Sequence, residues 1–359
     1  MERFLLKTRF SGQIAVFVQG DVKNTKGKLP FLTVHDVGSN HTSFLAFVEH
    51  KSMELARERS IWYHVCLPGQ EDGQDVMSES WNYPSLDELA QDLLDVMEFF
   101  NLSSIMGIGQ GVGANILCRL GIMHPFKCMG LVLLDFYSYG AGIDQHIWQT
   151  MFSWYSNSER LVGKMTKALV QQRDKRPEMY ACSSSSSNCA SSRNLTRLVE
   201  VFLKRSDLSK ALESNSRVDS LVMTGKRNEH WRLSSNTVRD HMDKTRATLL
   251  VLDDVADVLS DAPKNLARAL ILFCKGCGVL LGVPMVGLER NFHRVNKTLK
   301  RSRDESAEDE TRSRELCCSQ PGGAEASPQR ERRLQMEVAR RVLRCERSFS
   351  VDEDCCGEE

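Results

Sequence analysis

A glycine-rich segment near the middle of the chain has the spacing of a turn that carries a catalytic nucleophile. The pentapeptide Gly107–Gly111 reads G-I-G-Q-G, follows the apolar run Ser104–Ile108 and precedes the apolar stretch Ala114–Met123. Hydrolases with a G-x-S-x-G turn place the central serine between a strand and a helix, where small neighbours permit a sharp bend. The central residue of this match is Gly109, and glycine has no side-chain nucleophile. We therefore predict that Gly109 stands at the bend and that no acyl-enzyme forms there.

The acid and base of a serine hydrolase are also missing from their expected positions. The acid usually follows a late strand, where this chain has Asn228 with Glu229 beside it. The base would lie in the loop after the last core strand, Asp253–Asp257, but no histidine occurs between His241 and His293. Serine hydrolysis needs all three roles together. The sequence predicts a degenerate acid position at Asn228 and no catalytic residue.

The same glycines allow an alternative, a loop that binds a dinucleotide. Gly109, Gly111 and Ala114 match G-x-G-x-x-A, whereas Val112 breaks the stricter motif that would begin at Gly107. Dinucleotide loops open the first strand–helix unit of their domain, and this segment lies in mid-chain. We favour close packing of a helix on a strand as the reason for the glycines and predict no cofactor.

Neither the cysteines nor the histidines predict a metal site. Cys274 and Cys277 form one C-x-x-C, but a structural zinc site needs a second spaced pair or a cysteine–histidine set. His35, His41 and His64 lie near predicted strand ends. A cluster of these histidines in a cleft is an alternative, but hydrogen bonds to loop carbonyls are the more common arrangement, and we predict those.

Short apolar runs alternate with helical patterns over much of the chain, which is typical of a mostly parallel sheet. The predicted strands are Gln13–Val18, Phe31–His35, Ile61–Leu67, Ser104–Ile108, Gly130–Phe136, Ser220–Thr224 and Ala247–Leu252. The predicted helices are Leu86–Phe100 with Ser85 as its N-cap, Ala114–Met123 and Pro263–Cys274. Together with the bend at the glycine-rich segment, this order predicts an α/β-hydrolase-like fold.

Composition divides the chain into a core, a cap and a tail. Residues 1–142 and 217–288 are the two parts of the predicted core, and residues 143–216 are a helical cap interrupted by a serine-rich loop. Residues 289–359 are highly charged with few aromatic side chains, so we predict a mostly disordered tail. Within it, residues 329–349 have the spacing of a basic helix, a candidate contact for an acidic partner or a membrane surface.

The overall charge and the apolar pattern restrict partners and location. Lysine plus arginine and aspartate plus glutamate each number 47, so the chain lacks the basic excess of a nucleic-acid-binding protein. The first ten residues lack the apolar core of a signal peptide, and no run reaches the length of a membrane span. We predict a cytoplasmic protein with reduced cysteines, no transmembrane segment and, at most, peripheral membrane association.

One serine in the tail follows a pattern that basophilic kinases recognise. Arg301 and Arg303 precede Ser306 at the spacing R-x-R-x-x-S. Asp304 and Glu305 lie between Arg303 and Ser306. Phosphorylation there would add up to about two negative charges. An ordinary solvated charge run is the alternative, so Ser306 is a phosphorylation candidate.

Several stretches in the same order resemble the N-myc downstream-regulated (NDR) family. They are FLTVHDVGSNH (31–41), HVCLPGQEDG (64–73), YPSLDELA (83–90), GIGQGVGANIL (107–117) and GLVLLDF (130–136). The resemblance is strong over residues 10–140 and weaker in the cap. It implies a hydrolase fold without hydrolase activity, cytoplasmic residence and a role in growth, differentiation or stress responses through protein partners. The serine-rich cap insertion and the acidic, arginine-rich tail depart from the family pattern.

Three functions of different classes remain open at this point. The leading hypothesis is a non-enzymatic signalling or interaction module. The enzyme alternative is a hydrolase with a nucleophile relocated to another element, such as the cap. The third is a ligand sensor that retains the ancestral cleft without its chemistry.

Overall fold

The structure of the chain, a computed structural model, describes residues 1–140 and 192–284. The chain divides into two compact units, residues 1–267 and residues 268–359, and the sheet and the candidate site belong to the first. Residues 143–191 of the predicted cap, the predicted tail from residue 289 and Ser306 lie outside the described residues. The division into core, cap and tail therefore stays a prediction.

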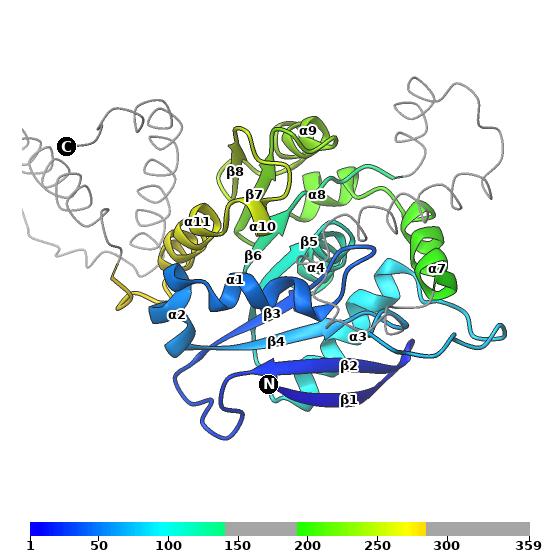
Figure 1. The fold of residues 1–359 in the computed structure, drawn as a ribbon. Helices are drawn as coiled ribbons and strands as arrows, with labels where there is room; N and C mark the ends of the chain where they lie inside the picture. Colours follow the sequence, from blue (N-terminus) through cyan, green and yellow to red (C-terminus); the bar gives the residue numbers. More distant parts are fainter. Residues whose placement is uncertain (141–191, 285–359) are drawn as a thin grey trace, which may run out of the picture. The chain divides into compact units, whose positions relative to one another are not determined.

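In the described part of the chain, eight strands form one mostly parallel sheet in the order β1-β2-β4-β3-β5-β6-β7-β8 (Figure 1). The strands are β1 (Glu2–Thr8), β2 (Gly12–Gln19), β3 (Leu29–Val34), β4 (Ser60–Cys66), β5 (Ile105–Gln110), β6 (Cys128–Leu134), β7 (Ser220–Gly225) and β8 (Ala247–Leu252). The β1–β2 and β2–β4 pairs are antiparallel, and all other pairs are parallel. This topology confirms the predicted fold class.

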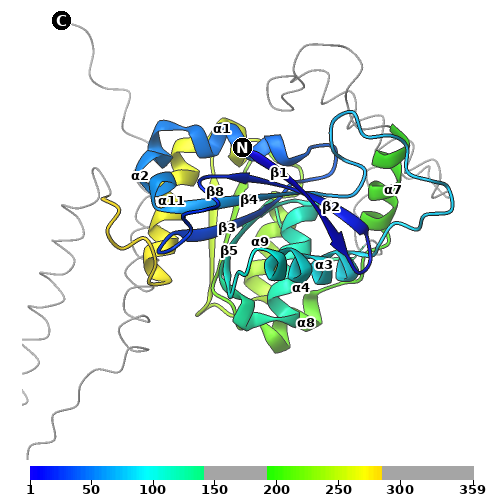
Figure 2. The same ribbon diagram turned by 90° about the horizontal axis from the view of Figure 1, so that it is seen from below.

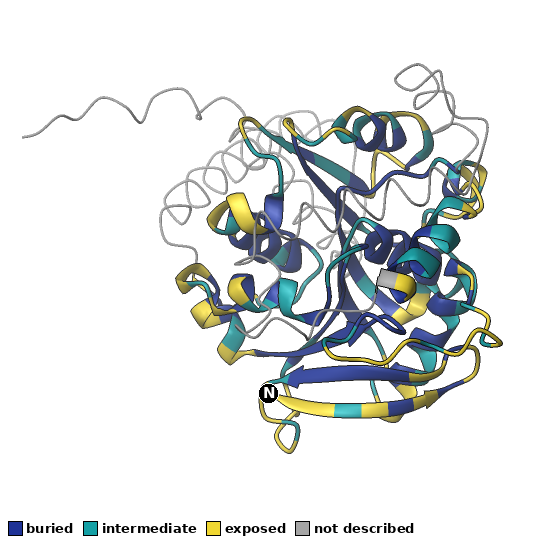
Figure 3. Cartoon of the chain, turned by 45° about the vertical axis from the view of Figure 1, so that its right-hand side comes forward, coloured by how far each residue is buried: buried dark blue, intermediate teal, exposed yellow. Residues whose placement is uncertain are grey.

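The central strands form because their apolar runs are buried on both faces. All seven residues of β4 are buried, and in Figure 3 the middle strands carry the colour of buried residues. Continuous apolar runs of this kind are typical of parallel sheets that helices cover on both sides. β1 differs, because exposed and buried residues alternate along its second half. It is an edge strand that the sequence analysis did not predict.

Helices lie on both faces of the sheet. The α-helices of the described residues are α1 (Leu45–Glu49), α2 (Glu54–Glu58), α3 (Leu86–Phe99), α4 (Val112–Met123), α7 (Ser192–Leu203), α8 (Ser209–Asn215), α9 (Trp231–His241), α10 (Val258–Asp261) and α11 (Pro263–Gly276). α1 and α2 lie on one side of the sheet, and α3, α4, α8 and α9 lie on the other (Figure 2). The predicted N-cap is correct, because Ser85 and Glu88 form a reciprocal capping box at the start of α3.

A buried arginine fastens α4 to its neighbours. The Arg119 side chain is 1% exposed, and its Nη1 lies 2.6 Å from Asp87 Oδ1 on α3. Its Nε donates to Asn115 Oδ1, and its Nη2 donates to the carbonyl oxygen of Ser206 at 2.7 Å. The guanidinium therefore joins α3, α4 and the segment between α7 and α8 through its fixed fork of donors.

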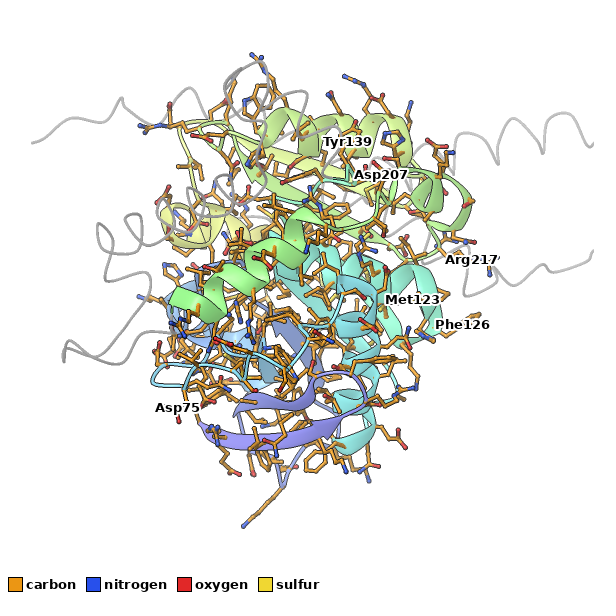
Figure 4. The ribbon with its side chains drawn as sticks, turned by 90° about the vertical axis from the view of Figure 1, so that its right-hand side faces the viewer. Asp75, Met123, Phe126, Tyr139, Asp207 and Arg217 are labelled. Carbon is orange, nitrogen blue, oxygen red and sulfur yellow. The ribbon has the colours of Figure 1, made fainter. Side chains whose placement is uncertain are left out.

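The chain leaves the sheet after β6 and returns before α8 through a hydrogen-bonded neck. The Gly140 amide donates to Asp207 Oδ2 at 3.0 Å, and Arg205 Nη2 donates to the carbonyl oxygen of Tyr139 at 2.9 Å. Ser138 accepts at its carbonyl oxygen from the Leu208 amide. Figure 4 labels Tyr139 and Asp207 close together at this neck.

α7 is anchored to the loop between β4 and α3 by one buried asparagine. Asn194 Nδ2 donates to the carbonyl oxygens of Gly69 and Asp75, at 3.1 and 3.0 Å. Asn194 Oδ1 accepts from the Met77 amide at 2.9 Å. The Asn194 side chain thus provides hydrogen-bond partners for three backbone groups of this loop, the carbonyl oxygens of Gly69 and Asp75 and the amide of Met77.

Candidate functional site

The sharp bend between strand and helix lies at Gly111, not at Gly109. β5 ends at Gln110, α4 begins at Val112, and Gly111 between them has φ 51° and ψ −110°. Gly109 is an ordinary residue of β5, so the prediction that it stands at the bend is wrong by two positions. The residue at a nucleophile elbow takes a strained conformation with positive φ, and Gly111 is the residue that does so.

The correct match to the elbow motif is therefore Gly109–Gly113, again with glycine in the central position. A Cβ on Gly109 would lie 2.6 Å from the Ala114 nitrogen, and a Cβ on Gly113 would overlap the carbonyl oxygen of Val34. The two flanking glycines thus let α4 approach β5 and β3 closely. This close contact agrees with the packing explanation of the glycine-rich segment.

The carboxyl group of Asp36 lies at the bend. Asp36 follows β3, and its Oδ1 accepts from the amides of Val37 and Val112 at 2.7 and 2.8 Å. A Cβ on Gly111 would overlap this carboxyl group. In α/β-hydrolases, the amide of the residue after the nucleophile and an amide of the loop after the third strand form the oxyanion hole. Val112 and Val37 occupy those two positions, and Asp36 accepts from both.

Two further carboxyl groups interact with Asp36 across the carboxyl ends of the strands. Asp135 follows β6 and accepts a hydrogen bond from Thr224 Oγ1 at 2.8 Å. Asp257 lies in the loop after β8 and accepts from Gln110 Nε2 at 2.8 Å. Asp257 also caps α10, where its Oδ1 accepts from the Leu259 amide. The carboxyl ends of parallel strands are the usual location of ligand and active sites in this class of fold.

The surroundings favour the protonated forms of these acids. Desolvation raises the pKa of Asp36 to about 6, and the nearby Asp257 carboxylate raises it further. Desolvation raises the pKa of Asp135 to about 8, again with contributions from Asp257 and Asp36. The pKa of Asp257 is also raised by desolvation. The described residues contain no group of three or more histidine, cysteine or acidic side chains able to hold a metal ion.

Asn228 lies where the sequence predicted, in the turn after β7, but its side chain serves the turn. Its amide donates to the carbonyl oxygen of Gly225, and its Oδ1 accepts from the His230 amide at 2.8 Å. Its interpretation as a degenerate acid position stays a prediction. Sequence reasoning missed Asp36 and Asp135, because hydrogen bonds across 76 and 89 residues of sequence hold them in place.

The three candidate histidines do not form a catalytic cluster. His35 Nδ1 donates to the carbonyl oxygen of Asp36 at 2.8 Å, while its Nε2 accepts from the Leu67 amide. His64 bonds instead to the side chains of Thr33 and Gln19. The His41 ring stacks on Phe17 with centroids 3.5 Å apart. The prediction of loop carbonyl partners is thus confirmed for His35 only.

Burial keeps all three imidazoles neutral. It lowers the pKa of His35 and of His41 to about 4 and that of His64 to about 3. A neutral His35 ring that donates at Nδ1 and accepts at Nε2 acts as a bridge between the ends of β3 and β4. Its two nitrogens are therefore occupied and unable to activate a nucleophile.

The strand order, the bend at Gly111 and the two converging amides define an α/β-hydrolase fold. Solved structures agree: an esterase from Thermogutta terrifontis matches with a TM-score of 0.56 and 16% identity, over 77% of this chain and 99% of its own. A meta-cleavage product hydrolase from Pseudomonas fluorescens matches with a TM-score of 0.53 and 13% identity, over 76% and 97% of the two chains. At these identities the likeness concerns the fold alone.

Within this class, the chain belongs to the Ndr family, whose sequence profile matches residues 6–281. It is 37% identical to an uncharacterised protein of Caenorhabditis elegans over 328 residues, which cover 89% of this chain and 96% of the relative. It is 26% identical to Protein NDRG4-A of Xenopus laevis over 78% of this chain and 73% of the relative. It is 37% identical to human Protein NDRG2 over about a third of each chain, 34% and 33%. These matches confirm the resemblance seen in the sequence.

Proposed function

We propose that this chain is a non-enzymatic α/β-hydrolase-fold protein that acts in the cytoplasm as a signalling or interaction module in growth, differentiation or stress responses. The observation that carries the proposal is the backbone of Gly111. The one residue of the elbow in the strained conformation of a catalytic nucleophile has no side chain.

Other features of the site support the absence of catalysis. Asp36 accepts hydrogen bonds from the amides that would stabilise an oxyanion. Residues 253–284, which follow β8, contain no histidine that could serve as a general base. None of the helices in the described residues combines the length and apolar character needed to cross a bilayer.

Covalent labelling with a fluorophosphonate probe, together with an activated-ester assay, tests the proposal. We expect no specific labelling of the full chain and no turnover above the uncatalysed rate, whereas an active serine esterase reacts in both assays. Labelling of one serine, with turnover that a point mutation at that serine abolishes, would instead establish the hydrolase with a relocated nucleophile. A reproducible shift of the melting temperature with one metabolite of a panel would favour the ligand sensor.

We also propose that the role of the module is regulated by phosphorylation of Ser306. The two arginines upstream of Ser306 would pair with acidic residues of a basophilic kinase. The modified serine would carry a charge that arginine side chains of a protein partner can bind.

A further inference from the structure

The Ndr-type bend keeps both amide donors of an oxyanion hole in working geometry. An oxyanion hole needs two donors about 2.7–3.1 Å from a single oxygen position. The Val37 and Val112 amides lie 2.7 and 2.8 Å from one atom, Asp36 Oδ1. The oxygen of a side chain therefore takes the place that a substrate oxygen would take in an active hydrolase.

The same carboxyl group also takes the place of a nucleophile side chain. A Cβ built on Gly111 would overlap Oδ1, Cγ and Oδ2 of Asp36. One acidic side chain thus fills both the hole and the adjacent space at residue 111. Asp36 and Gly111 are both partly exposed, so this position lies near solvent.

We propose that Asp36 is an autoinhibitory contact, in which its carboxyl group occupies an intact oxyanion hole and excludes small carboxylate anions from it. This inference concerns the site of the proposed function and rests on the assignment of Val37 and Val112 as the hole. It goes further, because a fold without a nucleophile could equally have lost the hole. Here both amide donors are retained, and the Asp36 carboxyl group occupies the space between them.

The charges around Asp36 set the strength of this contact. The carboxyl groups of Asp257, in the loop after β8, and of Asp135, directly after β6, interact electrostatically with Asp36. His35, directly after β3, is neutral. The positive end of the helix dipole at the start of α4 and the two amide donors favour the ionised carboxylate. A neutral acceptor of the same shape should therefore keep the hole closed, whereas a methyl group should open it.

Two substitutions at residue 36 distinguish an occupied oxyanion hole from an open one. Asp36→Ala removes the occupant, while Asp36→Asn retains an oxygen that accepts from both amides. The Val37 and Val112 amide signals are followed by nuclear magnetic resonance of the full chain during titration with sodium acetate at pH 7. We expect both signals of Asp36→Ala to move together and saturate at millimolar acetate, and those of the wild type and Asp36→Asn to stay unchanged.

The proposal is overturned if Asp36→Ala folds but its Val37 and Val112 amide signals do not move with acetate. It is also overturned if the wild type binds acetate equally well. If Asp36→Ala does not fold, a pH titration of the wild type decides. The Val37 and Val112 amides should then shift with one common midpoint, and both should lose that shift in Asp36→Asn. Flat or unrelated titrations refute the contact. Ester turnover by the wild type would refute the proposed function instead, so the two failures are distinguishable.

Discussion

The carboxyl group of Asp36 fills the space that a side chain on residue 111 would need. The two residues lie 75 positions apart in sequence, in the loop after β3 and at the turn between β5 and α4. An acidic side chain at residue 36 and glycine at residue 111 are therefore mutually dependent features of this site. That dependence can be measured.

Replacement of Gly111 by alanine should destabilise the protein for two reasons. The positive φ of residue 111 disfavours any Cβ by roughly 1–3 kcal/mol, and the overlap with Asp36 adds about 1–3 kcal/mol. The double variant Asp36→Ala/Gly111→Ala should recover the second part. We expect a coupling free energy of about 0.5–3 kcal/mol in a double-mutant cycle, measured by urea denaturation.

Gly27→Ala is the matched control for this cycle. Gly27 has φ 78°, but a Cβ there would meet no atom within 4 Å. Gly27→Ala should therefore show the backbone penalty alone and no coupling to Asp36→Ala. If the effects of Asp36→Ala and Gly111→Ala on the free energy of unfolding simply add, as those of Asp36→Ala and Gly27→Ala should, the overlap between residues 36 and 111 has no energetic cost and the prediction is wrong.

Asp135 should make the protein less stable as the pH rises. Desolvation raises its pKa in the folded state to about 8, whereas an aspartate in the unfolded chain titrates near pH 4. Between about pH 4 and pH 8, the folded state holds a proton that the unfolded state has released. The contribution of Asp135 to the free energy of unfolding therefore falls across this window as the pH increases.

Asp135→Asn should remove this contribution and make the pH slope of the unfolding free energy more positive than in the wild type, since the amide is neutral at every pH and still accepts from the Thr224 hydroxyl. The measurement is urea denaturation at half-unit steps from pH 4 to pH 8. Asp21→Asn, on the exposed loop after β2, is the control and should leave the slope as it is. An unchanged slope in Asp135→Asn would rule out titration of Asp135 in this window.

Arg119→Lys should destabilise the protein although it keeps the charge. Lysine lacks the planar fork that reaches Asp87, Asn115 and Ser206 at once, so at least one of these three hydrogen bonds of the buried Arg119 is lost. The expected loss is roughly 1–3 kcal/mol by chemical denaturation. The exposed Arg59→Lys should change stability by no more than about 0.5 kcal/mol. Equal effects of the two substitutions would contradict the structural role of the fork.

Ser306 should be the site that a basophilic kinase modifies in the tail. Incubation of the full chain with such a kinase and labelled ATP should give incorporation that Ser306→Ala removes. Substitution of Arg301 and Arg303 by alanine should reduce the rate, because the kinase would lose its charge-assisted contacts. Ser313→Ala serves as the control for a neighbouring serine, and undiminished incorporation in Ser306→Ala would disprove the assignment.

The strands of the core were predictable because burial on both faces leaves an unbroken apolar run. Ala247–Leu252 was predicted with its observed bounds, and Ile61–Leu67 was displaced by one residue. β1 escaped prediction because its charged residues, such as Arg3 and Lys7, obscure its apolar ones. An edge strand needs apolar residues on fewer positions, so its pattern is weaker.

The position of the bend was harder to predict than its existence. Glycines at 107, 109, 111 and 113 match the spacing of the elbow motif in more than one register, and local sequence cannot choose among them. Only the positive φ of Gly111 and the start of α4 at Val112 fix the register. Asp36 and Asp135 carry no local signal, because Val112 and Thr224, which donate hydrogen bonds to them, lie far away in the sequence.

The hydrogen-bonded neck between residues 138–140 and 207–208 affects where the chain can change in length. Because Gly140 is hydrogen-bonded to Asp207 and Ser138 to Leu208, the two ends of the segment between them are held together at one place. Lengthening a closed excursion is thermodynamically mild, since each doubling of its length costs only about 0.6 kcal/mol. A change of chain length between Gly140 and α7 should therefore cost little stability, provided that the hydrogen bonds of the neck and of Asn194 are kept.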